Sequence, residues 1–412
     1  MIFSTKPFSI NGRQYQPPAR PTVVICLDGC SDDYLTAALD QGRMPNLARM
    51  AATGYRGLVR AALPTFTNVN NACIVSGVPP SVTGICGNYF LDPQSGEEVM
   101  MNAARYLRCE TILAAASKAG RKVAMLTAKD KLRELLSSGL HGIIFSAERA
   151  KEQMLGIPGL SHLAREVGQK SIEIYSAEAS LFILRAGVAL LEDNQADFLY
   201  LSLTDYIQHK YPPAAPESLD FLQSIDLQLG YLLELGAVIG ATADHGMNRK
   251  VRSDGKPNVI YLESELGEQF GEGIRVICPI TDPYVVHHGA LGSAVMIYLS
   301  EELLLDEIIR WLSQREGVAE VWTRGQAAIS LDLPSDRIGD LVVFSEQAVV
   351  MGRTPAYHDV DQLMEGLRSH GGRYEETVPL ILSEPTPLAE NAKDPRNFDV
   401  FSYLCTGDSH KN

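Results

Sequence analysis

Acidic and imidazole side chains follow several apolar runs in this sequence. The stretch SLTDYIQHKYPP, residues 202–213, contains Asp205 and, four residues later, His209. If the chain becomes helical after the apolar run, this spacing places both side chains on one face of a helix, where they could bind one metal ion. A solvated helix start with an acidic cap would give the same pattern, so this pair alone does not decide between the two interpretations.

The pattern recurs at other places in the chain. The run TVVICLDG contains Asp28, and AVIGATADHG contains the pair Asp244 and His245. A further histidine, His370 in RSHGGRYEE, precedes another apolar run, and the glycines after it allow the backbone to pack close to a ligand. In open α/β sheets, ligands bind outside the carboxyl ends of the strands, so we expect these side chains to converge.

Taken together, these residues are candidate metal ligands with oxygen and nitrogen donors: Asp28, Asp205, His209, Asp244, His245 and His370. Six ligands are enough for two ions. Carboxylate combined with imidazole suits zinc or manganese, whereas calcium prefers oxygen alone and structural zinc favours cysteine. The sequence therefore predicts a site for two transition-metal ions.

A hydroxyl group is the next candidate. In PTFTNVNNACIVSGVPP, residues 68–76 indicate a short helix that ends at Gly77, with Thr67 at its amino-terminal end. A threonine at this position could simply cap the helix. It would also lie beside the free N–H groups of the first turn, where a phosphate is favoured and an alkoxide is stabilised. Thr67 is therefore a candidate nucleophile.

The apolar runs themselves predict the fold. Strands that are buried on both faces have this near-continuous apolar character. Between the runs lie amphipathic segments such as 216–236, whose leucines recur at helical spacing. We therefore expect an α/β fold with a doubly wound, mostly parallel sheet and helices on both faces. The expected strands are 22–27, 123–128, 142–147, 198–203, 237–243 and 378–383.

Residues 265–350 have a different pattern of apolar and polar residues. They indicate a strand, a helix and two further strands, and the pattern of the larger sheet resumes only near Gly371. This segment is best explained as a small inserted α+β domain. The catalytic core would then comprise residues 21–264 and 351–407.

Composition limits the classes of partner and the location. The formal net charge of −14 argues against a nucleic-acid partner, which would require a basic surface. The first twenty residues lack a signal peptide, and no apolar run reaches the length of a membrane span. The seven cysteines include no CxxC pair and indicate buried thiols in a reducing compartment. We expect a cytoplasmic protein without a membrane partner.

The order of the motifs LDG, a threonine at a helix start, TDYIQH, ADHG and SHGG resembles the alkaline phosphatase superfamily, specifically its nucleotide pyrophosphatase and phosphodiesterase branch. The stretch MPNLARMAATG, residues 44–54, also resembles one that is common in that superfamily. The resemblance spans about residues 21–385. Within the branch, LPTFTNVNNACIVSGVPPSVTGICGNYF and AKDKLR are most similar to the phosphonoacetate hydrolases. That family cleaves the carbon–phosphorus bond of phosphonoacetate to give acetate and phosphate.

The resemblance implies two zinc ions per chain, with Mn²⁺ as an alternative metal. One ion would be held by Asp205, His209 and His370. The other would be held by Asp28, Asp244, His245 and the oxygen of Thr67. We prefer Thr67 to Thr65 as the nucleophile because its distance from SGVPP matches the family's helix.

The resemblance also assigns the substrate, a small phosphonate, and the residues around it. Thr67 would attack phosphorus to give a phosphothreonine, which water then hydrolyses. Asn88, in GICGNYF, would donate its amide to a phosphoryl oxygen, although a turn residue would also fit there. Lys129 and Lys131, after the run 123–128, are candidate cations for the substrate carboxylate, which gains charge as the carbon–phosphorus bond breaks. Lysines in a charge run are also commonly solvated.

Several alternatives stay open from the sequence. A phosphodiesterase or nucleotide pyrophosphatase would need an aromatic slot for a nucleoside, which Phe66 and Tyr89 could supply. A metal-dependent phosphomutase would be expected to have more arginines in the inserted domain and usually a serine nucleophile. A phosphate-binding protein would not need a nucleophile between two metals. The sequence does not decide whether the protein is a homodimer, nor the roles of His287, His288 and His358.

Overall fold

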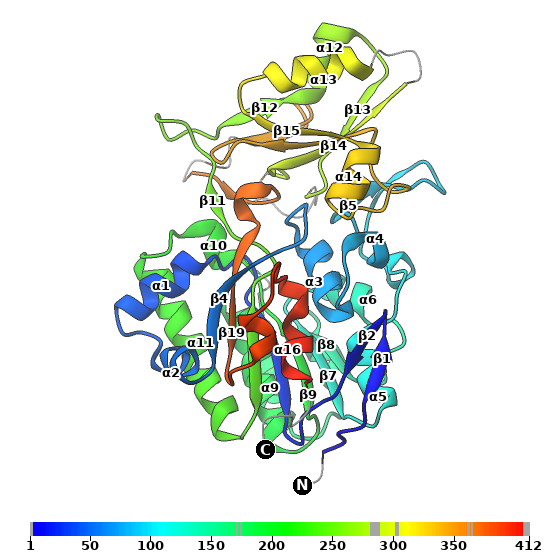
Figure 1. Ribbon diagram of the computed structural model, residues 1–412. Coiled ribbons are helices and arrows are strands. Elements are labelled where there is room, and N and C mark those ends of the chain that lie inside the picture. Colours follow the sequence, from blue (N-terminus) through cyan, green and yellow to red (C-terminus); the bar gives the residue numbers. More distant parts are fainter. Residues whose placement is uncertain are drawn as a thin grey trace.

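A computed structural model describes residues 3–169, 172–173, 175–280, 289–300, 305–358, 360, 363 and 366–406. Its larger part is built around a seven-stranded sheet with the strand order β4-β19-β10-β3-β9-β7-β8 (Figure 1). These strands are β4 (Tyr55–Arg60), β19 (Thr377–Leu382), β10 (Val238–Thr242), β3 (Thr22–Cys26), β9 (Phe198–Ser202), β7 (Val123–Thr127) and β8 (Gly142–Ser146).

Five neighbouring strands, from β10 to β8, are parallel. The predicted strand at 378–383 exists as β19, but it pairs antiparallel with both β10 and β4. The edge strand β4 was not predicted, because it is exposed along much of its length and lacks a continuous apolar run: Leu58 is exposed where Val59 is buried. The prediction of a doubly wound, mostly parallel α/β sheet is confirmed.

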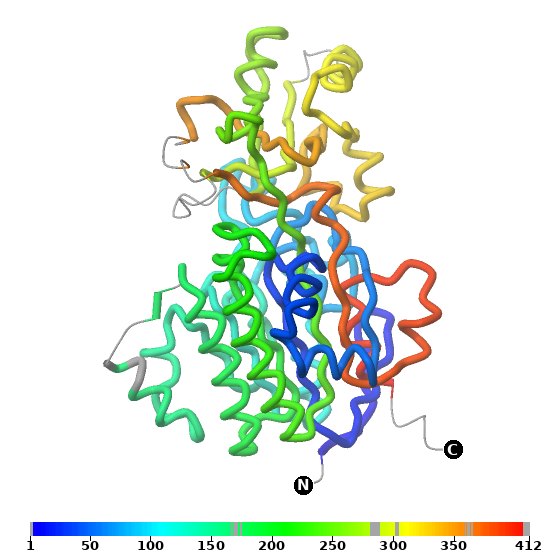
Figure 2. Tube along the Cα trace, turned by 90° about the vertical axis from the view of Figure 1, so that its left-hand side faces the viewer, coloured from blue at the N-terminus to red at the C-terminus, as the bar shows by residue number. Residues whose placement is uncertain are grey.

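Helices cover both faces of this sheet, as Figure 2 shows from the side. On one face, α11 (Pro216–Glu234) packs against α9 (Ala177–Glu192), α1 (Asp32–Asp40) and α2 (Pro45–Thr53). The carboxylate of Asp226, in the middle of α11, accepts the backbone N–H groups of Asn46 and Leu47 at the start of α2. On the other face lie α3 (Thr67–Ser76), α5 (Ile112–Lys118), α6 (Asp130–Leu136) and α16 (Val400–Leu404).

A second sheet lies above the end of the main sheet that carries α3 and α10 (Tyr206–Lys210) (Figure 1). Its antiparallel strands are β13 (Ile274–Ile277), β14 (Ala294–Leu299), β16 (Leu341–Ser345) and β15 (Val318–Thr323). Three helices accompany this sheet: α12 (Leu262–Phe270), α13 (Leu305–Gln314) and α14 (Arg324–Ser330). It has a hydrophobic cluster of its own that extends from Ile260 to Met351. The domain boundaries at 265 and 350 stay a prediction.

The chain crosses between the two parts along paired strands. β11 (Asn248–Arg249) pairs with β18 (Arg368–Ser369), and β12 (Val259–Tyr261) pairs with β17 (Val350–Gly352). At this crossing Lys250 is fully buried, and its ammonium lies 2.8 Å from the carboxylate of Glu375 and donates to the carbonyl of Gln347 at 2.6 Å. The crossing leads directly into His370.

Shorter elements complete the described chain. They are β1 (Phe8–Ile10), β2 (Arg13–Tyr15), α4 (Pro80–Thr83), β5 (Tyr89–Leu91), β6 (Glu98–Met100), η1 (Ala104–Tyr106), α7 (Ala150–Gln153), α8 (Ser161–Gln169), η3 (Arg373–Glu375), α15 (Pro387–Glu390) and η4 (Asn397–Asp399). Among the helices that the structure describes, none has both the length and the apolar character that crossing a bilayer requires.

Candidate active site

Three carboxylates follow adjacent strands of the main sheet. Asp28 lies two residues after β3, Asp205 three residues after β9, and Asp244 two residues after β10. Because β3 lies between β10 and β9 and all three strands are parallel, their carboxyl ends meet at one edge of the sheet. The three side chains are buried there.

The first group of candidate ligands consists of Asp205, His209 and His370. The helix α10 begins directly after Asp205, so His209 is on the face that the spacing predicted. Its Nε2 lies 3.0 Å from Oδ2 of Asp205. The Nε2 of His370 approaches the same oxygen to 3.8 Å. One potential ligand atom from each residue lies within 4.8 Å of those of the other two, which suits a single cation.

The second group consists of Asp28, Asp244 and His245. The Nε2 of His245 lies 3.3 Å from Oδ1 of Asp28 and 3.8 Å from Oδ2 of Asp244. The potential ligand atoms again lie within 4.8 Å of one another. The two groups adjoin, because the rings of His245 and His370 stack with centroids 3.5 Å apart and planes 7° apart.

All three imidazoles are held by a backbone carbonyl on the side away from the groups. Each Nδ1 lies 2.7–2.9 Å from its carbonyl oxygen, and since such an oxygen only accepts, Nδ1 carries the proton. In the neutral ring, the lone pair of each Nε2 then faces the carboxylates, as in metal-binding histidines. The pairs are His209 with Arg368, His245 with Gly246, and His370 with Thr65.

Two ligand atoms in the second group are unsatisfied. Oδ1 of Asp28 and Nε2 of His245 are buried, and neither has a hydrogen-bond partner within the described residues. Burying such atoms without a partner is costly, and a cation between them would remove that cost. The donor set and its geometry therefore fit two transition-metal ions.

The electrostatics of the cluster also favour a cation. Burial and the neighbouring charge of Asp28 raise the pKa of Asp244 to about 7. Burial alone would lower the pKa of His245, but Asp244 and Asp28 outweigh it and raise that pKa to about 9. Burial, followed by His245 and His209, holds the pKa of His370 well below its usual value, which keeps that ring neutral. Burial together with the close carboxylates thus accounts for the raised pKa values of Asp244 and His245, and divalent cations would relieve the repulsion among the carboxylates.

Lys129 lies between the two groups. Its Nζ is 3.0 Å from Oδ1 of Asp205 and 3.3 Å from Oδ2 of Asp28, and its side chain is 30% exposed. In both carboxylates, the oxygen facing Lys129 is not the one that faces a histidine. Burial lowers the pKa of Lys129, but the charges of Asp205 and Asp28 raise it well above its usual value, so the side chain is a cation.

Lys131 occupies a different place. It lies in the first turn of α6, is half-buried, and its Nζ is 3.6 Å from Sδ of Met100 in β6. The structure therefore places Lys129 against the carboxylates and Lys131 toward the β5–β6 hairpin.

Thr67 is the first helical residue of α3, and Phe66, not Thr67, occupies the cap position. The hydroxyl of Thr67 has no hydrogen-bond partner among the residues that the structure describes. Thr65 differs, because its hydroxyl donates to the carbonyl of Gly372 and accepts the N–H of Gly371, both at 3.0 Å. The hydroxyl of Thr65 therefore binds the segment that carries His370, whereas the hydroxyl of Thr67 is available for a substrate or a metal.

Asn88 lies beside the start of α3. Its Oδ1 accepts the backbone N–H of Asn68 at 3.0 Å, so it satisfies one of the free N–H groups of the first turn. This bond fixes the amide next to Thr67 and leaves its NH₂ group for another acceptor. Asn88 is therefore more than a turn residue beside Gly87.

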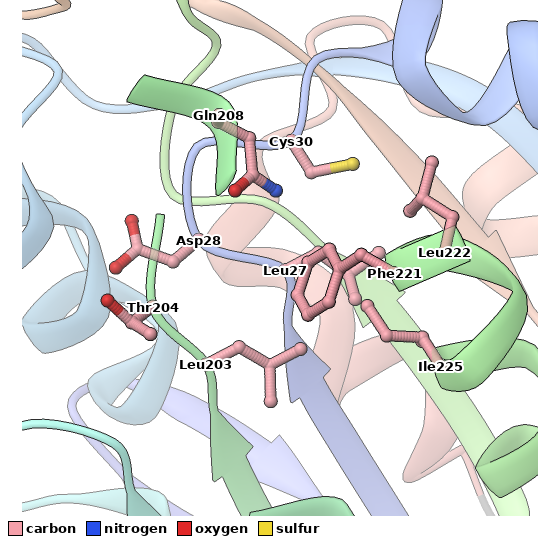
Figure 3. Close-up of a pocket in the computed structure, with 9 residues that line it drawn as sticks. All are labelled: Leu27, Asp28, Cys30, Leu203, Thr204, Gln208, Phe221, Leu222 and Ile225. Carbon is pink, nitrogen blue, oxygen red and sulfur yellow. The ribbon is translucent and has the colours of Figure 1, made fainter. Parts of the chain in front are cut away.

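The pocket behind Asp28 is not a substrate site. It is lined by Leu27, Asp28, Cys30, Leu203, Thr204, Gln208, Phe221, Leu222 and Ile225 (Figure 3). Its lining is mostly apolar and it has no room for a water molecule. Figure 3 shows the carboxylate of Asp28 directed away from Leu222 and Ile225.

The sequence left the roles of three further histidines open: His287, His288 and His358. His358 is buried, its Nδ1 lies 2.9 Å from the carbonyl of Gly289, and its Nε2 accepts the N–H of Arg353 at 2.9 Å. Both ring nitrogens are thus used by backbone groups, which is a structural role. His287 and His288 lie outside the described residues.

Sequence reasoning missed Asn71, whose amide contacts both α3 and Asp244. The available signal was its position four residues after Thr67, which places it on the same helix face.

The comparisons with known proteins agree with this site. A model of the type I phosphodiesterase / nucleotide pyrophosphatase family matches residues 22–373. Among solved structures, phosphonoacetate hydrolase from Sinorhizobium meliloti 1021 in complex with phosphonoacetate is 45% identical, with a TM-score of 0.92. The match covers 98% of this chain and 99% of that one, and the values are the same for that enzyme in complex with phosphonoformate.

A more distant structure shares the fold. An inactive form of murine ectonucleotide pyrophosphatase / phosphodiesterase 5 in complex with AMP is 15% identical, covers 94% of each chain and has a TM-score of 0.63. At that identity the likeness concerns the fold alone. The family match and the 45% identical relative confirm the resemblance seen in the motifs. The chain therefore belongs to the type I phosphodiesterase / nucleotide pyrophosphatase family, in the alkaline phosphatase superfamily.

Proposed function

We propose that this protein hydrolyses phosphonoacetate to acetate and phosphate. The observation that carries the proposal is the 45% identity, over almost the whole of both chains, to a phosphonoacetate hydrolase that was solved with phosphonoacetate. The chemistry of the site agrees with it. Two groups of buried ligands, an available hydroxyl at a helix start and two lysines suit a substrate with a phosphoryl group at one end and a carboxylate at the other.

We propose that the metals are two zinc ions, with Mn²⁺ as a functional substitute. Asp205, His209 and His370 would hold one ion. The other would be held by Asp28, Asp244, His245 and the oxygen of Thr67. When bound, two such ions would lower the pKa of a coordinated hydroxyl and offset the negative charge of the phosphoryl group. The mixed carboxylate and imidazole donors, with each Nε2 facing inward, support this choice of metal.

Thr67 is the proposed nucleophile. Its hydroxyl loses its proton to solvent, and its oxygen bonds to phosphorus as the carbon–phosphorus bond breaks, which gives a phosphothreonine. The electron pair of the broken bond moves into the acetate group, whose carbon then takes a proton from solvent. Water subsequently breaks the bond between phosphorus and the threonine oxygen, so phosphate leaves and Thr67 is restored. The N–H groups of the first turn of α3 favour the phosphoryl group at this position.

Three polar side chains would orient the substrate. Asn88, fixed by its bond to the N–H of Asn68, would donate its NH₂ group to a phosphoryl oxygen. Lys129 and Lys131 would stabilise the carboxylate end, where negative charge grows as the carbon–phosphorus bond breaks. The position of Lys129 beside Asp28 and Asp205 also lets it offset the charge of the ligands themselves.

A nucleotide substrate has less support. Phe66, one of the two aromatic residues that could form a nucleoside slot, is fully buried and packs edge-on against His370, with ring centroids 5.7 Å apart. It is therefore not available to stack on a base. Tyr89 is half-buried in β5, and its hydroxyl donates to the carbonyl of Glu98.

A substrate comparison tests the proposed activity. Metal-stripped protein is reloaded with zinc or manganese and incubated with phosphonoacetate, a nitrophenyl phosphodiester and a phosphoglycerate, while acetate and phosphate are measured. We expect equal amounts of acetate and phosphate from phosphonoacetate, loss of turnover with a chelator, and recovery with zinc. Two metals per chain should be found by elemental analysis. Faster turnover of the diester than of phosphonoacetate would contradict the proposal, and so would an active preparation without transition metal.

We further propose a cytoplasmic location and keep the homodimer as a hypothesis. The seven cysteines all lie within the described residues and form no disulfide there, and six of them are buried, which suits a reducing compartment. The mass in solution, measured by light scattering, checks the oligomeric state.

A further inference from the structure

Asn71 joins the nucleophile-bearing helix to one of the metal-ligand groups. It is fully buried on α3, one turn after Thr67. Its Nδ2 donates to the backbone carbonyl of Thr67 at 2.9 Å and to Oδ2 of Asp244 at 3.1 Å. Its Oδ1 accepts the hydroxyl of Tyr200 at 2.6 Å and that of Ser202 at 2.8 Å. All four hydrogen bonds of the amide are therefore made to protein groups.

The surroundings fix the amide in one orientation. The groups next to its nitrogen, a carbonyl and a carboxylate, only accept, and the groups next to its oxygen are hydroxyls that donate. A flipped amide would turn its oxygen toward two acceptors and its NH₂ toward the hydroxyls. Tyr200 and Ser202 belong to β9, the strand that leads to Asp205, so the amide is held by the sheet that carries the ligands.

The hydrogen bond from Asn71 to Asp244 is made at Oδ2, the carboxylate oxygen that is directed toward the second group of candidate ligands. Oδ1 of Asp244 already accepts the backbone N–H groups of Gly29 and His245, both at 3.1 Å. Oδ2 is the oxygen that lies 3.8 Å from Nε2 of His245 and so faces the second group. Within the described residues, its hydrogen bond comes from Asn71. The amide therefore sets the direction of the lone pair that remains on Oδ2.

We propose that Asn71 is a positioning residue that fixes the nucleophile Thr67 and the ligand Asp244 relative to each other. This inference rests on the proposed function. Rigid coupling matters here because the oxygen of Thr67 and the carboxylate of Asp244 are assigned to the same cation. A displacement of α3 relative to β10 would change both at once. Groups behind metal ligands commonly change metal affinity by about 10- to 100-fold when they are removed.

The preceding residue provides a matched control. Asn70 is also fully buried on α3, and its amide binds the N–H and carbonyl of Ala62, the carbonyl of Phe66 and the side chain of Asn397. It contacts none of the candidate ligands among these partners. Asn70→Ala therefore removes a buried amide of the same kind from the same helix without touching Asp244.

The experiment compares Asn71→Ala and Asn70→Ala as metal-free proteins titrated with zinc against a chelating indicator. For Asn71→Ala we expect one of the two zinc sites to weaken by about 10- to 100-fold. At saturating zinc its kcat for phosphonoacetate should fall more than its KM changes, since geometry and not substrate binding is lost. Asn70→Ala should keep both zinc affinities even if its Tm falls as much. Wild-type zinc affinities in a folded Asn71→Ala, or equal losses in both variants, would overturn the inference.

A milder variant covers the case in which Asn71→Ala does not fold. Tyr200→Phe removes one of the two hydroxyls that orient the amide and leaves both bonds of Nδ2 in place. It should weaken the same zinc site by a smaller factor, and zinc affinities equal to those of the wild type would overturn the inference. The zinc titration is also independent of the substrate. A wild-type protein that binds two zinc ions but does not act on phosphonoacetate would therefore contradict the proposed function and leave the comparison of variants valid.

Discussion

The ammonium of Lys129 lies 3.0 Å from Oδ1 of Asp205, while the other oxygen of that carboxylate, Oδ2, lies 3.0 Å from Nε2 of His209. One oxygen of Asp205 thus faces the ammonium of Lys129, and the other faces the imidazole of the candidate ligand His209. Asp28 repeats the arrangement, with Oδ2 toward Lys129 and Oδ1 toward His245. Lys129 is therefore part of the framework of the site as well as a candidate for substrate binding, whereas Lys131 is not among these contacts.

Because Lys129 and Lys131 have different contacts, replacing each of them by alanine should affect the enzymatic activity differently. Lys131→Ala should lower kcat/KM for phosphonoacetate by roughly ten- to a thousandfold, the scale for losing one preorganised charge contact. Hydrolysis of a nitrophenyl phosphate ester, whose leaving group has no carboxylate, should change far less. Lys129→Ala should reduce both activities, because it also leaves Asp28 and Asp205 without their cation. The ratio of the two losses is the measurement, and a ratio near one for Lys131 would exclude it from carboxylate binding.

The two threonines of TFTN should also behave differently. Thr67→Ala should abolish turnover with little change in Tm and with both metals still bound, since its hydroxyl has no hydrogen-bond partner within the described chain and three protein ligands remain at its ion. Thr65→Ala removes two buried hydrogen bonds and should destabilise the fold by about 1–3 kcal/mol. Denaturant unfolding and mass spectrometry of acid-quenched reactions check this. A phosphorylated threonine trapped at Thr65 would mean that the nucleophile is misassigned.

The sequence predicts most of the main sheet because its central strands are buried on both faces and are therefore continuously apolar, as in FLYLS of β9. It does not predict β4, an edge strand with an exposed leucine, or the direction of β19, since parallel and antiparallel strands can share the same periodicity. Five of the six candidate ligands are predictable because each follows the end of a main-sheet strand or lies one helical turn beyond it. His370 is predicted differently, from its place before the run 378–383 and from the glycines that follow it.

Contacts distant in sequence are not predictable in this way. Asn71 receives its orientation from Tyr200, 129 residues later. Its spacing of four residues from Thr67 is a signal, but Asn70, three residues after Thr67, also neighbours Thr67 on a helix, so spacing alone does not decide between the two. Likewise, the contact of Thr65 with Gly371 and Gly372 spans about three hundred residues and depends on the crossing chain that carries His370. Residues that are close in sequence, such as Asn70 and Asn71, thus have different tertiary contacts, and the local sequence pattern does not contain that information.

The buried ion pair at the crossing between the two parts predicts a strong effect on stability. Lys250→Met would leave Glu375 charged and buried without its partner, and the free energy of unfolding should fall by about 3–5 kcal/mol. The double variant Lys250→Met with Glu375→Gln removes both charges and should recover part of the loss. Chemical denaturation of the three proteins measures this. A single variant as stable as the wild type would show that the ion pair does not hold the crossing.

The pKa shifts of the ligands predict how metal removal changes stability with pH. The pKa of Asp244 is raised to about 7 and that of His245 to about 9. A group with a raised pKa stabilises the fold while it is protonated, and this contribution is lost as the pH rises from the unfolded value to the folded one. Chelator-treated protein should therefore lose stability between about pH 4 and 9. Zinc needs deprotonated ligands, so its binding strengthens over the same range. The difference in Tm between zinc-loaded and chelator-treated protein should increase steadily from pH 5 to 9. A difference that stays constant or shrinks would mean that Asp244 and His245 do not bind the metal.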